Sequence, residues 1–105
     1  MTDKEMVKFI SERVPLPSLL MGLAEECAEL QQGLHKLERA IRGENPTTVT
    51  PMTSVQWINE ELSDVLLYAE ILSVLGYEPD DSRDKKLKRW VERLNMNNEI
   101  KVLEE

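Results

Sequence analysis

Five carboxylates in two short segments are the residues of this sequence best suited to chemistry. They are Glu25, Glu26 and Glu29 in the first segment and Glu61 and Asp64 in the second. Both segments lie within apolar patterns that predict helices, and residues three or four positions apart share one face of a helix. Each helix therefore presents a pair of carboxylates one turn apart. If the two helices pack antiparallel, four carboxylates could meet at one point: Glu26, Glu29, Glu61 and Asp64.

Such a cluster indicates a metal site. Carboxylates held together without cations repel one another and lose hydration, at a cost of several kcal/mol. A hard divalent ion with oxygen ligands, Mg²⁺ or Mn²⁺, would remove that cost. Acidic pairs on helices more often form an ordinary solvated face. The second pair favours the metal site, because Leu66, Leu67 and Tyr68 follow it at once and leave few positions for such a face.

The sequence argues against the other common catalytic arrangements. A di-iron site in a helical bundle needs Glu-x-x-His pairs, whereas the only histidine, His35, has Gln32 at that spacing. His35 also lies far along its helix from any partner for a serine or cysteine nucleophile. The sequence has no Gly-x-x-x-x-Gly-Lys phosphate loop. If the protein is an enzyme, a metal ion and a water molecule must do its chemistry.

Four helices are expected to position these residues. Apolar periodicity and capping residues predict helices at residues 3–13 and 18–42, from Thr53 or Ser54 to residue 75, and at 80–95, with fraying from about residue 96. The second helix carries an apolar stripe: Leu23, Cys27, Leu30, Leu34, Leu37 and Ile41. Beside the stripe, Gly22 and Gly33 extend the track of Glu26 and Glu29 by one step in each direction. We expect one all-α domain over residues 1–105, a four-helix bundle that oligomerisation completes.

Composition narrows the possible functions. The 105 residues are enough for one core, and the net charge of −7 argues against a general nucleic-acid binder but permits binding of a single nucleotide. Cys27 is the only cysteine, so the sequence has no disulfide framework and no thiolate metal site, and its place on the apolar stripe predicts burial. Because the sequence does not open on a basic and apolar leader and has no apolar run of membrane-spanning length, we expect a cytoplasmic protein with no membrane partner.

Basic residues gather in the last predicted helix and at the end of the second. The last helix contains Arg83, Lys85, Lys86, Lys88, Arg89 and Arg93. A basic run is often only a solvated surface. In a chain this acidic, however, a subset could hold a polyphosphate beside the metal: Arg39, Arg42, Lys85, Lys86 and Arg89. Trp57 and Trp90 are expected in the core or at an interface rather than as base-stacking platforms.

The acidic pattern resembles that of a known family. The order Glu25-Glu26-x-x-Glu29, a spacer, and Glu61-x-x-Asp64 is similar to the Glu-Glu-x-x-Glu and Glu-x-x-Asp signature of MazG-like proteins, which are all-α nucleoside triphosphate pyrophosphohydrolases. The likeness extends to residues 43–47 and 86–90 and covers most of the chain between about residues 21 and 94.

The resemblance implies a helical bundle that hydrolyses a nucleoside triphosphate between its α- and β-phosphates, giving the monophosphate and pyrophosphate. It implies that Glu26, Glu29, Glu61 and Asp64 bind Mg²⁺, for which Mn²⁺ could substitute. Glu25 would be a second-metal ligand or the base that orients the attacking water. Asn45, in the matched loop, is expected to contact the substrate together with the basic residues. Family members commonly form dimers or tetramers with sites at or near the interface.

Two functions other than nucleotide hydrolysis stay open, and the apolar surface of the chain separately predicts assembly. The chain could be a non-catalytic helical interaction module, or it could bind a nucleotide without turnover. The two long helices carry apolar residues beyond the main stripe, and a lone bundle would leave some of them exposed to solvent: Leu19, Met21, Leu66, Leu67 and Ile71. We therefore expect a symmetric homodimer or homotetramer.

Overall fold

The chain is all-helical over the residues that its structure describes. The computed structural model describes the backbone of residues 1–43 and 50–104 and the side chains of these ranges up to residue 97. Its helices are α1 (Asp3–Arg13), α2 (Leu16–Arg42), α3 (Pro51–Val74) and α4 (Arg83–Glu104). The all-α prediction is confirmed. None of these helices, within the described ranges, is long and apolar enough to cross a membrane.

The first two helices begin and end largely where the sequence predicts. Thr2 caps α1, its hydroxyl accepting from the backbone N–H of Glu5 at 3.1 Å while the Glu5 carboxylate accepts from the Thr2 N–H. The second helix starts two residues earlier than predicted. Proline is compatible with the first turn, where its missing N–H has no partner in any case, so Pro17 does not delay the start. The helix ends at Gly43, which adopts the left-handed conformation with φ of 69°.

The last two helices differ more from prediction. Thr50, rather than Thr53 or Ser54, caps α3, and its hydroxyl accepts from the Thr53 N–H at 3.2 Å. The backbone of α4 stays helical to Glu104, where fraying from about residue 96 was predicted. Neither proline nor glycine interrupts residues 83–104, so no residue there breaks the helix.

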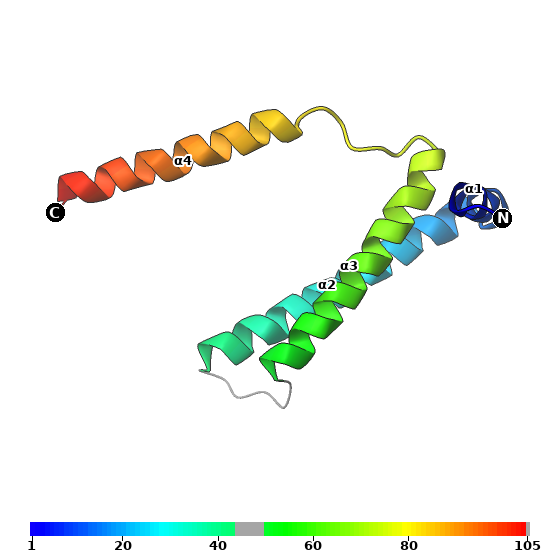
Figure 1. The fold of residues 1–105 in the computed structure, drawn as a ribbon, viewed down its shortest axis with the longest axis horizontal. Helices are drawn as coiled ribbons and strands as arrows, with labels where there is room; N and C mark the ends of the chain where they lie inside the picture. The colour runs from blue at the N-terminus through cyan, green and yellow to red at the C-terminus, as the bar shows by residue number, and fades with distance from the viewer. Residues whose placement is uncertain (44–49, 105) are drawn as a thin grey trace.

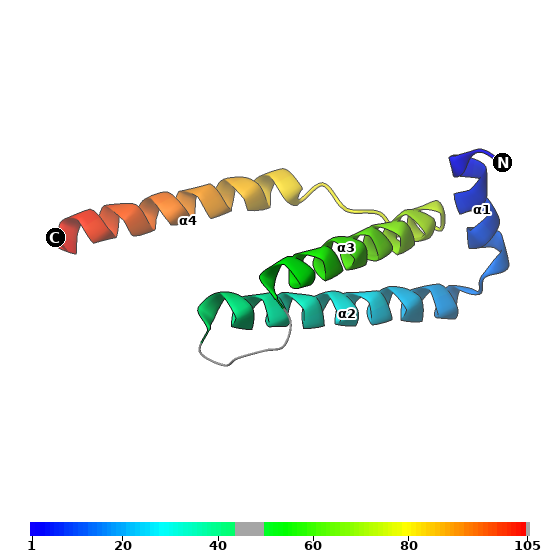
Figure 2. The ribbon, with the colours of Figure 1, turned by 60° about the horizontal axis from the view of Figure 1, so that its bottom comes forward.

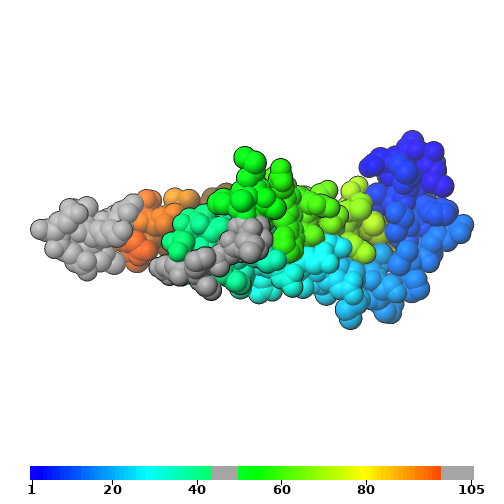
Figure 3. Space-filling view, turned by 90° about the horizontal axis from the view of Figure 1, so that it is seen from below, coloured from blue at the N-terminus to red at the C-terminus, as the bar shows by residue number. Residues whose placement is uncertain are grey.

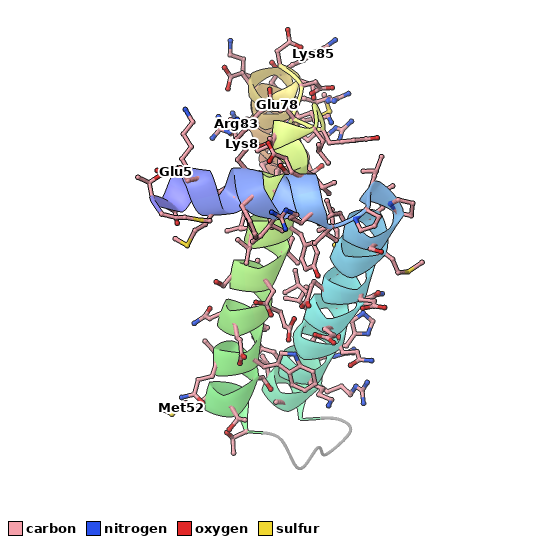
Figure 4. All side chains as sticks on the ribbon, turned by 90° about the vertical axis from the view of Figure 1, so that its right-hand side faces the viewer. Glu5, Lys8, Met52, Glu78, Arg83 and Lys85 are labelled. Atoms are coloured by element: carbon pink, nitrogen blue, oxygen red, sulfur yellow. The ribbon has the colours of Figure 1, made fainter. Side chains whose placement is uncertain are left out.

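The core lies where α1 crosses the paired long helices. Helices α2 and α3 run antiparallel side by side (Figures 1 and 2), and α1 lies across their ends, with Met52 marking the opposite end of α3 (Figure 4). The buried apolar cluster at this crossing consists of Val7, Leu19, Ile71 and Leu72. Of the five extra apolar residues of the long helices, Leu19 and Ile71 are therefore core residues, whereas Met21, Leu66 and Leu67 are exposed.

Within the described residues, the four helices of the single chain do not close into a bundle, and completion of the bundle by oligomerisation stays a prediction. Helix α4 runs clear of the α2–α3 pair (Figures 1 and 2), and the space-filling view shows an elongated molecule with α1 and α4 at opposite ends (Figure 3). The radius of gyration is 19.2 Å, whereas a compact domain of about 100 residues has about 13 Å. Every side chain of α4 between residues 83 and 97 is exposed.

Candidate metal centre

A track of small and acidic residues on α2 faces α3. Gly22 lies so close to Tyr68 that an added Cβ would overlap the Tyr68 ring, and a Cβ on Gly33 would lie 3.3 Å from Cγ1 of Ile58. Both glycines are buried. Glu26 and Glu29 lie between them on the same track, so the glycines allow the two helices to approach closely at either end of the acidic segment.

Three carboxylates meet in the middle of this contact. Oxygens of Glu26 and Glu29 on α2 and of Glu61 on α3 all lie within 4.8 Å of one another, a spacing at which one cation can be shared. The Glu61 side chain is 9% exposed. Among the residues that the structure describes, Oε2 of Glu26 and Oε2 of Glu61 are buried and have no hydrogen-bond partner. Buried oxygens without partners carry a large desolvation cost, which a bound cation would offset.

The cluster changes the acidity of its members. Burial, together with hydrogen bonds to Glu26 and Glu29 and their negative charge, raises the pKa of Glu61 from 4.5 to about 7. The hydrogen bond with Glu61 lowers the pKa of Glu26, but burial and the charges of Glu29 and Asp64 outweigh it and the pKa of Glu26 is raised. Without a cation, the folded protein therefore holds protons at this site to higher pH than the unfolded chain does.

Asp64 and Glu25 lie beside the cluster rather than in it. Asp64 is half-buried one turn beyond Glu61, and its charge contributes to the raised pKa of Glu26. Glu25 is exposed, on the turn of α2 that carries Glu26. Of the four predicted metal ligands, three are thus brought together and the fourth is a neighbour. The Glu25 carboxylate stands at the rim, open to solvent.

The structure does not bring the predicted substrate-binding cations to these carboxylates. Arg39 is exposed ten residues beyond Glu29 on α2, about 15 Å away at about 1.5 Å per residue. Arg42 pairs with Glu38 at 2.7 Å. The three basic residues predicted from the last helix lie on the exposed surface of α4: Lys85, Lys86 and Arg89. Asn45 falls outside the described residues.

The face of α2 that packs against α3 is not the one predicted, and this difference places the acidic residues at the helix contact. Cys27, predicted to be buried on the apolar stripe, is exposed. Leu34 and Ile41 on the same stripe are also exposed. The face of α2 that meets α3 is instead the track of Glu26 and Glu29 with its two glycines. The reason is steric, because glycine permits the closest approach of a second helix.

Two further features of the α2–α3 contact, away from the cluster, were not predicted from the sequence. Ser54 on α3 is fully buried, and its hydroxyl oxygen has no hydrogen-bond partner in the described part of the chain. The signal was its position seven residues before Glu61, which places both on one helix face. The ammonium group of Lys36 lies 4.3 Å from the ring centroid of Trp57, a cation–π contact between α2 and α3.

Comparisons of the chain with models of known protein families, with curated proteins and with solved structures found no match.

The pKa of Glu61 predicts how the stability of the metal-free protein depends on pH. Because the folded-state pKa exceeds the unfolded value of 4.5, the folded state binds more protons in the window between 4.5 and about 7. The free energy of unfolding should then fall as pH rises through this window, relative to Glu61→Gln, which cannot titrate. Urea unfolding of both proteins in chelator across this pH range measures the difference. If the difference in the free energy of unfolding between the wild type and Glu61→Gln does not change with pH, the raised pKa of Glu61 is contradicted.

Proposed function

We propose that this protein is a Mg²⁺-dependent nucleotide pyrophosphohydrolase similar to the MazG-like proteins, cleaving a nucleoside triphosphate to the monophosphate and pyrophosphate. One observation supports this most strongly. Two helices bring three carboxylates within 4.8 Å of one another, and two of their buried oxygens, Oε2 of Glu26 and Oε2 of Glu61, lack partners in the described structure. A solvated acidic surface does not bury its carboxylate oxygens in this way.

The residues present fit a hard divalent cation. All three contribute carboxylate oxygens, the donor type that Mg²⁺ and Mn²⁺ prefer. Glu26, Glu29 and Glu61 would hold the ion, and Asp64, whose charge contributes to the raised pKa of Glu26, would join them. The ion would supply charge neutralisation for the phosphate groups.

The side chains around this position have separate roles in the proposed reaction. Glu61 must give up its proton to bind a cation, and its pKa of about 7 places that loss near neutrality. The exposed carboxylate of Glu25 is free to accept a proton from a water attacking the phosphate, or to hold a second cation. Direct attack by water on phosphorus requires positioning and charge neutralisation rather than a nucleophilic side chain.

Screening of the eight common nucleoside triphosphates with Mg²⁺ tests the proposal. At least one should give equal amounts of monophosphate and pyrophosphate, because cleavage falls between the α- and β-phosphates. Release of orthophosphate would place cleavage at another bond. Absence of turnover with every substrate would refute the enzymatic proposal, and nucleotide-dependent thermal stabilisation without products would instead favour a binding protein.

A further inference from the structure

A tyrosine ring of α3 lies directly against the backbone of α2 at Gly22. A Cβ added to Gly22 would lie 2.5 Å from Cζ of Tyr68 and 2.5 Å from its hydroxyl oxygen, and it would also overlap Cε1. Carbon atoms in contact are normally about 3.5–4.0 Å apart. The ring therefore occupies the space that a side chain would take, and a methyl group at this position would displace the ring by about 1 Å or more.

The Tyr68 ring is held in place from its other side. Tyr68 is half-buried and packs against the buried apolar cluster of Val7, Leu19, Ile71 and Leu72. Because protein interiors are close-packed, a ring with neighbours on both sides cannot move away from an added methyl group without moving its helix as well. Crowding at Gly22 would therefore push α3 away from α2.

The contact between Gly22 and Tyr68 is in register with the carboxylate cluster. Tyr68 follows Glu61 by seven residues on α3, and Gly22 precedes Glu29 by seven residues on α2. Seven residues are two helical turns, about 10 Å of helix, so each pair of residues shares one helix face. Because α2 and α3 run antiparallel (Figure 2), the contact lies two turns from the point where Glu29 and Glu61 meet. A helix is a rigid element, so a displacement of α3 at Tyr68 is carried to Glu61.

The carboxylate cluster has little tolerance for such a displacement. Glu26, Glu29 and Glu61 each offer an oxygen within 4.8 Å of the other two. Glu61 is buried, and its Oε2 has no hydrogen-bond partner in the described part of the chain, so this oxygen faces the cluster without support from another group. Ligand distances in a metal site are defined to about 0.2 Å, and Mg²⁺ demands near-ideal octahedral geometry. A displacement of Glu61 by about 1 Å exceeds what a cation site accepts.

We propose that the seat of the Tyr68 ring on Gly22 sets the separation of α2 and α3 and thereby forms the cation site, so that Gly22 and Tyr68 are positioning residues for Glu61. Neither residue has to touch the cation. This role rests on the cation site of the proposed function and does not require nucleotide hydrolysis. The same role accounts for a glycine in the interior of a long helix, where alanine has the higher intrinsic propensity.

Gly33 provides the matched control. It is also a buried glycine of α2, and it lies four residues from Glu29, nearer to the cluster than Gly22. A Cβ added to Gly33 would lie 3.3 Å from Cγ1 of Ile58 and 3.4 Å from Cδ1 of Trp57, so a movement of a few tenths of an ångström would accommodate it. Steric overlap predicts the larger effect at Gly22, whereas distance from the cluster predicts the larger effect at Gly33.

Calorimetric titration with Mn²⁺ of the wild type, Gly22→Ala and Gly33→Ala tests the role, with circular dichroism confirming that each protein is folded. Gly22→Ala should bind Mn²⁺ at least about tenfold more weakly than the wild type, because its ligands are misplaced. Gly33→Ala should bind Mn²⁺ within about threefold of the wild type. Unchanged binding by Gly22→Ala, or an equal loss in the two variants, would overturn the proposal.

A rescue experiment separates crowding from general loss of stability. Leucine lacks Cε1, Cζ and the hydroxyl oxygen, the atoms of Tyr68 that an added Cβ would overlap. The double variant Gly22→Ala with Tyr68→Leu should therefore bind Mn²⁺ within about threefold of Tyr68→Leu alone, a non-additivity that only residues in contact show. If Gly22→Ala alone does not fold, the double variant should recover both folding and Mn²⁺ binding.

The outcomes separate this role from the proposed function. Additive losses of Mn²⁺ affinity in the double variant, or a double variant that does not recover, would overturn the positioning role. A wild type that does not bind Mn²⁺ refutes the cation site and the proposed function together. Normal Mn²⁺ binding by the wild type that Gly22→Ala leaves unchanged refutes the positioning role alone.

Discussion

Glu61→Gln should abolish nucleotide hydrolysis while making the metal-free protein more stable at pH 8. The variant keeps the size of the side chain and removes a buried carboxylate from among like charges, so the folded state loses repulsion. It also removes a ligand from the proposed cation site. A divalent cation supplies several kcal/mol of transition-state stabilisation, and about 1.4 kcal/mol is a factor of ten, so turnover should fall by about 10³-fold or more.

Glu60→Gln is the control for this prediction. Glu60 precedes Glu61 on α3 and carries the same charge, but its side chain is exposed and lies outside the cluster. Glu60→Gln should retain turnover within about a factor of three of the wild type, since neutralising an exposed carboxylate changes the energetics of the protein little. Thermal unfolding in chelator and steady-state kinetics in Mg²⁺ measure the two effects. A Glu61→Gln protein that is less stable than the wild type and still active would contradict the assignment of Glu61 to a cation site.

Leu19→Ala should produce the largest loss of stability. Leu19 is 2% exposed and packs in the apolar cluster where α1 crosses the long helices. Truncation of a buried leucine to alanine costs about 2–5 kcal/mol, a large fraction of the stability of a small domain. Urea unfolding followed by circular dichroism, at one fixed protein concentration, measures the change.

The adjacent leucine provides the comparison. Leu20 is 43% exposed on the same turn of α2, so Leu20→Ala removes the same atoms from a position that is only partly buried. Its cost should be about 1 kcal/mol or less. If the two substitutions cost the same, the core is not centred where α1 crosses α2 and α3.

The helices could be predicted from the sequence because their signals are local. The Thr2 and Glu5 capping box and the Gly43 stop act within a few residues of the helix ends that they define. The packing could not be predicted in the same way. The apolar stripe of α2 indicated its core face, but the close approach permitted by Gly22 and Gly33 put the acidic track against α3 instead. The position of α4 depends on the connection before it and on what covers its apolar face, neither of which is encoded in helical periodicity.

The carboxylate site could be predicted in part for the same reason. The i, i+3 spacing within each helix is a local property, so the convergence of Glu26, Glu29 and Glu61 followed once α2 and α3 paired antiparallel. Asp64 shares a helix face with Glu61, yet side-chain direction and helix rotation leave it beside the cluster. Which cations would bind a phosphate could not be predicted, because Lys85 and Arg89 lie on a helix whose packing partner the spacing does not reveal.

The most direct test of the account is a Mn²⁺ titration followed by electron paramagnetic resonance, in which bound ions lose the sharp signal of the free ion. The central claim is that Glu26, Glu29 and Glu61 form a divalent cation site. The wild type and Glu60→Gln should bind Mn²⁺ alike, and Mg²⁺ should displace it. Glu61→Gln should bind Mn²⁺ at least about tenfold more weakly, a loss of about 1.4 kcal/mol. Equal Mn²⁺ binding by wild type and Glu61→Gln would contradict the claim.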